Sequence, residues 1–113
     1  MEVTPKQIIY YKTLLEYVPY EVWYSEIKDV RLQLAVDKRL ERLESGNYGD
    51  CEPVGGGVLE LRFHAFGVRI YFAEIGGVIV LLLCAGDKAS QKKDIAKAKE
   101  YWTEYNSRIE EEV

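Results

Sequence analysis

The segment 57–102 contains five side chains that could bind a phosphate group or transfer a proton: Arg62, His64, Arg69, Tyr71 and Lys88. Guanidinium and ammonium groups hold phosphates and stabilise the charge that builds on them in a transition state. A histidine can act as a general acid or base, and a tyrosine ring can stack on a nucleobase. The sequence has no paired-carboxylate, Cys–His or Ser–His pattern and no cluster of metal ligands. These residues therefore suit a phosphodiester substrate, and no cofactor is predicted.

Strand alternation predicts that most of these side chains share one face of a hairpin. The segments 58–64 and 68–74 alternate in side-chain type, and the short turn 65–67 joins them. Their regularly spaced apolar residues must face the core. The opposite face is expected to be open and to carry four of the five side chains: Arg62, His64, Arg69 and Tyr71.

Each of these residues also has a purely structural explanation. Arg62 and Arg69 could pair with neighbouring glutamates of the same hairpin, Glu60 and Glu74. Lys88 could be a solvated turn residue, His64 an exposed histidine at a strand end, and Tyr71 a packing residue. We favour the functional reading for the two arginines, because both point to one sheet face.

The local charge differs from the overall charge. The formal net charge is −4, which taken alone argues against a nucleic-acid partner. The segment 88–99, however, carries five lysines and a single acid, Asp94. At the start of the last helix, Gln91, Lys92 and Lys93 are therefore predicted to contact the substrate. The alternative for Gln91 and Asp94 is favourable placement at the positive end of that helix.

The rest of the chain is expected to support this segment. Residues 7–13 predict a strand, and residues 19–27 a short helix that starts at a proline. Asp29 is expected to cap a second helix that ends at Ser45 and Gly46, with Arg39 and Arg42 on its solvated face. Its apolar stripe, which is expected to face the core, comprises Val36, Leu40 and Leu43. Residues 45–57 hold five glycines and a proline, and predict a loop rather than a phosphate-binding motif, since no Gly-Lys-Ser/Thr follows.

Two further elements complete the predicted fold. Residues 78–85 are apolar throughout, as in a strand that is buried on both faces. A final helix begins after Ser90, and its apolar stripe is expected to pack on the core face of the sheet: Ile95, Ala98, Trp102, Tyr105 and Ile109. The predicted order is β-α-α-β-β-β-α in a single α+β domain, residues 1–113, with the helices packed on one face of a mostly antiparallel sheet.

The composition predicts a cytoplasmic protein. No apolar run approaches the ~20 residues of a membrane span, and the N-terminus lacks the pattern of a secretion signal. Cys51, in the predicted loop, and Cys84, at the end of the apolar strand, match no metal motif. Both are expected to be free thiols.

Several segments together resemble the RelE/ParE superfamily of bacterial toxins, and within it the HigB-like "addiction module killer" proteins. The matching segments are RLERLESGNYGDCEPVGGGVLELR at 39–62, GVRIYF at 67–72, VLLLCAGDKASQKKDIAKAKE at 80–100 and the aromatic stretch at 19–23. The resemblance covers nearly the whole chain in order. It implies a microbial-ribonuclease-like α+β fold and a partner antitoxin, often a helix-turn-helix DNA-binding protein.

For the RelE-like branch, the resemblance implies metal-independent cleavage of mRNA in the ribosomal A site. By motif, Arg62 follows the leucine of the first hairpin strand, Arg69 is the arginine of Gly-x-Arg, and Lys88 takes the basic position after the last strand. In RelE relatives, positions of this kind bind the phosphate and stabilise the transition state. No membrane partner is expected, and DNA is expected to be reached only through the antitoxin.

The resemblance leaves the proton-transfer group open. Val58 and Glu60 stand where RelE has lysines, and Asp94 stands where it has a tyrosine, so His64, Asp94 and Tyr71 remain the candidates. Two other functions also stay open. One is a ParE-like, non-enzymatic inhibition of DNA gyrase, which the missing base and the acidic net charge would suit. The other is a degenerate toxin that only binds its antitoxin.

Overall fold

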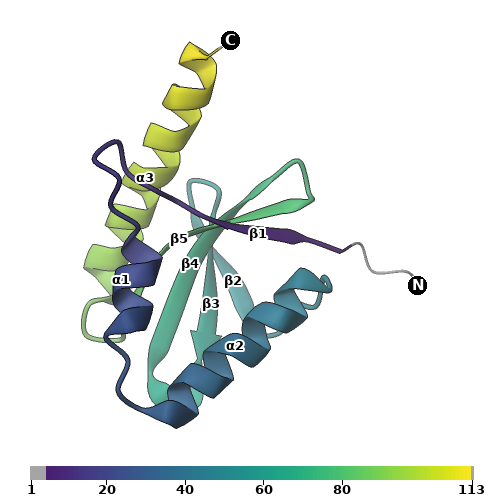
Figure 1. Cartoon of the computed structure of the whole chain (residues 1–113), viewed down its shortest axis with the longest axis vertical. Helices are drawn as coiled ribbons and strands as arrows, with labels where there is room; N and C mark the ends of the chain where they lie inside the picture. The colour runs from purple at the N-terminus through teal and green to yellow at the C-terminus, as the bar shows by residue number, and fades with distance from the viewer. Residues whose placement is uncertain (1–4, 113) are drawn as a thin grey trace.

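The computed structural model describes residues 5–112, which form one five-stranded sheet and three α-helices (Figure 1). The elements follow in the order β1 (Gln7–Tyr10), α1 (Pro19–Ser25), α2 (Val30–Glu44), β2 (Cys51–Gly55), β3 (Val58–Phe63), the 3-10 turn η1 (His64–Phe66), β4 (Val68–Ile75), β5 (Ile79–Asp87) and α3 (Gln91–Glu111). The strand order across the sheet is β1-β5-β4-β3-β2. Only the β1–β5 pair is parallel. The prediction of an α+β fold with a mostly antiparallel sheet is therefore confirmed.

Local sequence signals set several element ends as expected. Asp29 caps α2, since its carboxylate accepts a hydrogen bond of 2.9 Å from the backbone N–H of Arg31. Pro19 opens α1. Gly67 ends η1 with a φ of 65°, a left-handed conformation that glycine adopts without strain, and this lets the chain reverse into β4.

The prediction that residues 45–57 form a loop is wrong for its second half. Cys51–Gly55 is strand β2, which pairs antiparallel with β3 and shifts register between Pro53 and Gly55. A proline within a run argues against an interior strand, but β2 lies at the edge of the sheet, where the missing N–H costs little. Cys51 consequently lies in a strand and is half-buried. Strand β1 and helix α1 are also shorter than the predicted 7–13 and 19–27.

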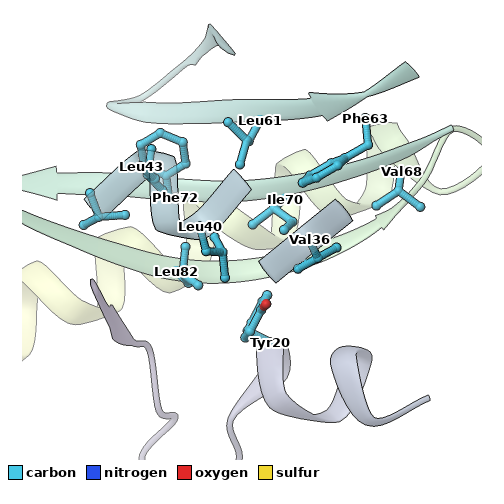
Figure 2. Close-up of a cluster of buried hydrophobic side chains, with 11 residues drawn as sticks. Tyr20, Val36, Leu40, Leu43, Leu61, Phe63, Val68, Ile70, Phe72 and Leu82 are labelled. Carbon is cyan, nitrogen blue, oxygen red and sulfur yellow. The ribbon is translucent and has the colours of Figure 1, made fainter. Parts of the chain in front are cut away.

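One face of the sheet packs against α1 and α2. Figure 2 shows Leu61, Ile70 and Phe72 of the sheet meeting side chains of the two helices. The helical side of this core comprises Tyr20, Val36, Leu40 and Leu43. The predicted apolar face of α2 is thus confirmed, and so is the parity of the two hairpin strands.

The other face of the sheet packs against α3, so the prediction of helices on a single face is wrong. Tyr71, Leu81 and Leu83 point to this side and form a second core with the predicted stripe of α3. The physical reason is that β4 and β5 are interior strands with apolar side chains on both faces, and each face must be covered. The C-terminal end of α3 extends past the sheet (Figure 1). Ile109, two residues before the end of this helix, accordingly remains 42% exposed.

The backbone of β5 at Gly86 lies very close to side chains at the start of α3. A Cβ atom on Gly86 would lie 1.9 Å from Asp94 Oδ2 and 2.7 Å from Ser90 Oγ. Ser90 stands at the predicted N-cap position, but its hydroxyl donates to the Asp94 carboxylate at 2.5 Å instead of capping a backbone N–H. The helix start therefore lies directly on the strand, where a side chain at position 86 does not fit.

Gly86→Ala is accordingly expected to lower the free energy of unfolding by about 1–3 kcal/mol, because the start of α3 must shift away from β5. Urea denaturation of the two proteins measures the difference. The double variant Gly86→Ala/Asp94→Ala is the control, since it removes the carboxylate nearest to the added methyl group. Additive losses in the double variant would show that the close contact is not the cause.

Candidate active site

Four of the five predicted catalytic side chains line one small pocket at the turn end of the β3–β4 hairpin. The pocket has a volume of about 130 Å³, and its lining includes Arg62, His64, Arg69 and Lys88. They come from the end of β3, from η1, from the start of β4 and from the residue after β5. The structure thus brings three permanent cations and the single histidine of the sequence to one place.

The sheet register explains this convergence. Arg62 lies opposite Arg69 in the β3–β4 pair, and Arg69 lies opposite Gly86 in the β4–β5 pair. The chain leaves β5 two residues later, and the backbone N–H of Lys88 donates to the carbonyl of Gly67 at 2.9 Å. This bond holds the start of the β5–α3 connection against the hairpin turn, so Lys88 reaches the same pocket.

A buried carboxylate, Glu60, lies behind the two arginines. Its side chain has no exposed area. Arg62 Nε donates to Glu60 Oε1 at 2.7 Å, Gln91 Nε2 donates to Oε2 at 2.9 Å, and Arg69 Nε lies 3.8 Å from Oε2. Burial by itself raises the pKa of Glu60, but the hydrogen bonds from Arg62 and Gln91 outweigh it and the pKa is lowered. Glu60 is therefore a charged residue that fixes the arginines.

This arrangement corrects the expected open sheet face. Helix α3 covers the face that carries Glu60, and the arginine side chains remain only partly exposed, 28% for Arg62 and 13% for Arg69. The structural alternative, in which the arginines pair with Glu60, is compatible with a role in the pocket. Each guanidinium has several N–H donors and can serve both. One of them, Arg69 Nη1, also donates to the carbonyl of Gly67 at 3.3 Å.

Tyr71 lies away from the pocket, so its predicted place on an open face is wrong. Its side chain is fully buried under α3, opposite Glu60 in the β3–β4 pair. Its hydroxyl has no hydrogen-bond partner among residues 5–112. Burial, followed by the charge of Glu60, raises the pKa of Tyr71. A buried phenol of this kind neither stacks on a base nor transfers a proton to a substrate in the pocket.

The predicted substrate-binding residues at the start of α3 are not brought to the pocket either. The side chain of Gln91 donates its hydrogen bond to Glu60, while Lys92 and Lys93 are exposed and lie outside the pocket lining. Asp94 is turned toward Ser90 and Gly86. The physical reason is that the apolar stripe of α3, and not its charged side chains, faces the sheet.

His64 stands at the mouth of the pocket beside a carboxylate. Its Nε2 atom lies 2.5 Å from Asp50 Oδ2, and the imidazole is 74% exposed. The backbone around this pair is held by Arg39, whose guanidinium donates to the carbonyls of Tyr48, Asp50 and Arg62. Arg39 is therefore not the solvated residue that the helix pattern predicted. Burial lowers its pKa, and its guanidinium lies 4.8 Å from the centre of the Phe63 ring.

Two residues of the site, Asp50 and Arg39, were missed from sequence, and Glu60 was expected only as an alternative ion-pair partner of the arginines. Glu60 carried a signal, because a carboxylate two residues before Arg62 on the same strand face can reach its guanidinium. Asp50 and Arg39 carried no such signal in the sequence, since their partners are reached only when α2 packs beside the hairpin.

Within residues 5–112, no group of three or more His, Cys, Asp or Glu side chains is placed to hold a metal ion. In the same residues, no helix has the length and apolar character needed to cross a membrane.

Comparison with known proteins finds one protein of similar sequence that covers most of this chain. No protein-family model matches the chain. A curated protein of Haemophilus influenzae, described as an uncharacterized protein, is 42% identical over 81 residues, which cover 71% of this chain and 82% of the relative. An identity of this size over most of both chains shows common descent. This chain belongs to the same protein family as that Haemophilus influenzae protein.

Proposed function

We propose that this protein is the toxin of a type II toxin–antitoxin pair and that it cleaves mRNA on the ribosome without a metal ion. One observation carries the proposal: Arg62, Arg69, Lys88 and His64 surround a single pocket. A phosphodiester is the substrate that three cations and an imidazole suit. The resemblance to RelE/ParE toxins, carried by segments that include these residues, supports the same function. It also supports a cognate antitoxin as partner in the cytoplasm.

In the proposed reaction, the ribose 2′-hydroxyl attacks the adjacent phosphorus and the bond to the 5′ oxygen breaks. The products are a 2′,3′-cyclic phosphate and a free 5′-hydroxyl. Negative charge increases on the non-bridging oxygens as the reaction proceeds. Arg62 and Arg69, which pair with Glu60, and the exposed Lys88 would stabilise that charge.

His64 is the best-placed residue for the proton transfers. It lines the pocket, whereas Tyr71 is buried and Asp94 is engaged by Ser90. Asp50, whose Oδ2 atom lies 2.5 Å from Nε2, would orient the ring. Because the imidazole is 74% exposed and its contact to Asp50 is made through Nε2, the Nδ1 atom would remain for the reacting oxygen.

His64→Ala is expected to lower the cleavage rate by about 10²–10⁴-fold, since it removes a general acid or base. Asp50→Asn should lower it less, because the imidazole remains. Single-turnover cleavage of mRNA bound to purified ribosomes measures both variants. His64 is exposed, so thermal unfolding of the variants should match the wild type. A fully active His64→Ala protein would exclude His64 as the proton-transfer group.

Expression of the protein without its antitoxin tests the function as a whole. We expect growth arrest, rapid loss of translation and new mRNA ends in phase with codons. Induction of the DNA-damage response with translation intact would instead identify the ParE-like inhibition of gyrase, which the net charge of −4 also suits. Normal growth would identify a protein that only binds its partner.

A further inference from the structure

We propose that the groove between α2 and η1 binds the nucleotide next to the scissile phosphate, so that RNA is held at two adjoining sites. The groove has a volume of about 370 Å³ and opens beside the pocket described above. The inference rests on the proposed function, because it takes the pocket as the place of the scissile phosphate.

The groove and the pocket are continuous. Arg62, Phe63 and His64 line both of them. If the phosphate of an RNA chain lies among the cations of the pocket, the next sugar and base of that RNA can lie in the groove. No helix or β-strand has to be crossed. His64 stands at the junction of the two sites.

Charge on one helix face matches a nucleic-acid strand. Ala35, Lys38, Arg39 and Arg42 line the groove at helical spacings of three and four residues. Lys38 and Arg42 are exposed, and among residues 5–112 no carboxylate lies within ion-pair distance of either. Asp50 is the acidic residue in the lining, and it is paired with His64. The groove is thus locally basic in a protein whose net charge is −4.

The remaining lining suits a nucleobase. Phe66 is half-buried at the groove and packs against the first core, which fixes its ring. Phe63 also lines the groove, but it is buried and the Arg39 guanidinium lies over its ring, so Phe66 is the ring that can receive a base. An aromatic ring that is held in place and partly exposed provides a stacking platform that accepts any base. An acidic peptide would match the charge equally well, but continuity with the phosphate pocket favours RNA.

Binding of short, uncleavable RNA tests the inference. The probes are 5′-labelled 2′-O-methyl oligonucleotides, a dinucleotide and a hexanucleotide, followed by fluorescence anisotropy with the full-length protein. Lys38→Ala/Arg42→Ala is expected to weaken binding of the hexanucleotide about tenfold, since two exposed contacts to phosphate are lost. The slope of log K against log salt should become less steep by roughly 1.4, as for two phosphate contacts on a single strand. Dinucleotide binding should change much less.

Two further variants sharpen the test. Phe66→Leu keeps most of the core volume and should weaken the hexanucleotide about tenfold with an unchanged salt slope, because it removes stacking and no charge. Lys12→Ala/Lys28→Ala makes the same change in net charge, and neither lysine lines the groove or the pocket. This control should bind the hexanucleotide like the wild type.

Several results would overturn the inference. They are wild-type affinity of Lys38→Ala/Arg42→Ala for the hexanucleotide, equal losses for both probes, or an equal loss in the Lys12→Ala/Lys28→Ala control. Binding of a poly-glutamate peptide in place of the hexanucleotide would show that the groove holds protein. RNA binding through the groove without RNA cleavage in cells would instead refute the proposed function and leave the groove assignment standing.

Discussion

Glu60→Ala is expected to lower the free energy of unfolding by about 3 kcal/mol, the largest effect on stability that we expect from a site residue. Removing one partner of a buried ion pair typically costs 3–5 kcal/mol, because the other charge is left without compensation. The lower value applies here since Arg62 is 28% exposed and can turn to water, whereas Arg69, at 13%, is more confined. Urea denaturation of the variant and the wild type measures the loss.

A double-mutant cycle separates the ion pair from the packing of the side chain. Glu60→Leu/Arg69→Met replaces the buried charges by apolar groups of similar size, and it should recover much of the stability that Glu60→Leu alone loses. Equal stability of Glu60→Leu and the double variant would show that Arg69 is not stranded by the loss of the carboxylate.

The same carboxylate gives the stability a pH dependence. The pKa of Glu60 is lowered in the folded protein, so its contribution is fully present above the pKa of the unfolded chain, about 4.3. That contribution is expected to disappear as the pH falls below this value and through the lowered pKa. In Glu60→Gln the free energy of unfolding should therefore fall less steeply with pH in this range, and an unchanged dependence would contradict the assignment.

Lys88→Ala is expected to lower the rate of RNA cleavage by about 10²–10³-fold while leaving stability within about 0.5 kcal/mol of the wild type. Lys88 is exposed, lines the pocket, and has no ion pair among residues 5–112, so its loss removes the proposed phosphate-binding cation and little else. Single-turnover cleavage on programmed ribosomes measures the rate.

Lys88 is a cleaner probe of the site than either arginine. Replacing Arg69 also leaves Glu60 buried with one partner fewer, so a loss of activity would mix chemistry with folding. Lys28→Ala is the matched control, since it removes the same charge at a position that lines neither the pocket nor the groove. Wild-type cleavage by Lys88→Ala would contradict the assignment of Lys88 to the phosphate.

Much of the candidate site could be predicted from the chain because it depends on strand parity. The alternation in 58–64 and 68–74 correctly placed Arg62 and Arg69 on the same face of the hairpin. The register then brings Lys88 beside them through the β4–β5 pair. Edge strand β2 was missed because its glycines and proline are loop signals, and only its place at the sheet edge makes a strand possible there.

The sequence by itself determined the order of most elements, the inward faces of α2 and of the hairpin, and the set of cations available to a phosphate. These features follow from the periods of 2 and 3.6 residues, which are local. Only the tertiary structure decided that α3 covers the second face of the sheet, that Glu60 and Tyr71 are buried beneath it, and that His64 meets Asp50. Those contacts join segments that no local period relates, and they form because apolar side chains on both faces of β4 and β5 must be removed from water.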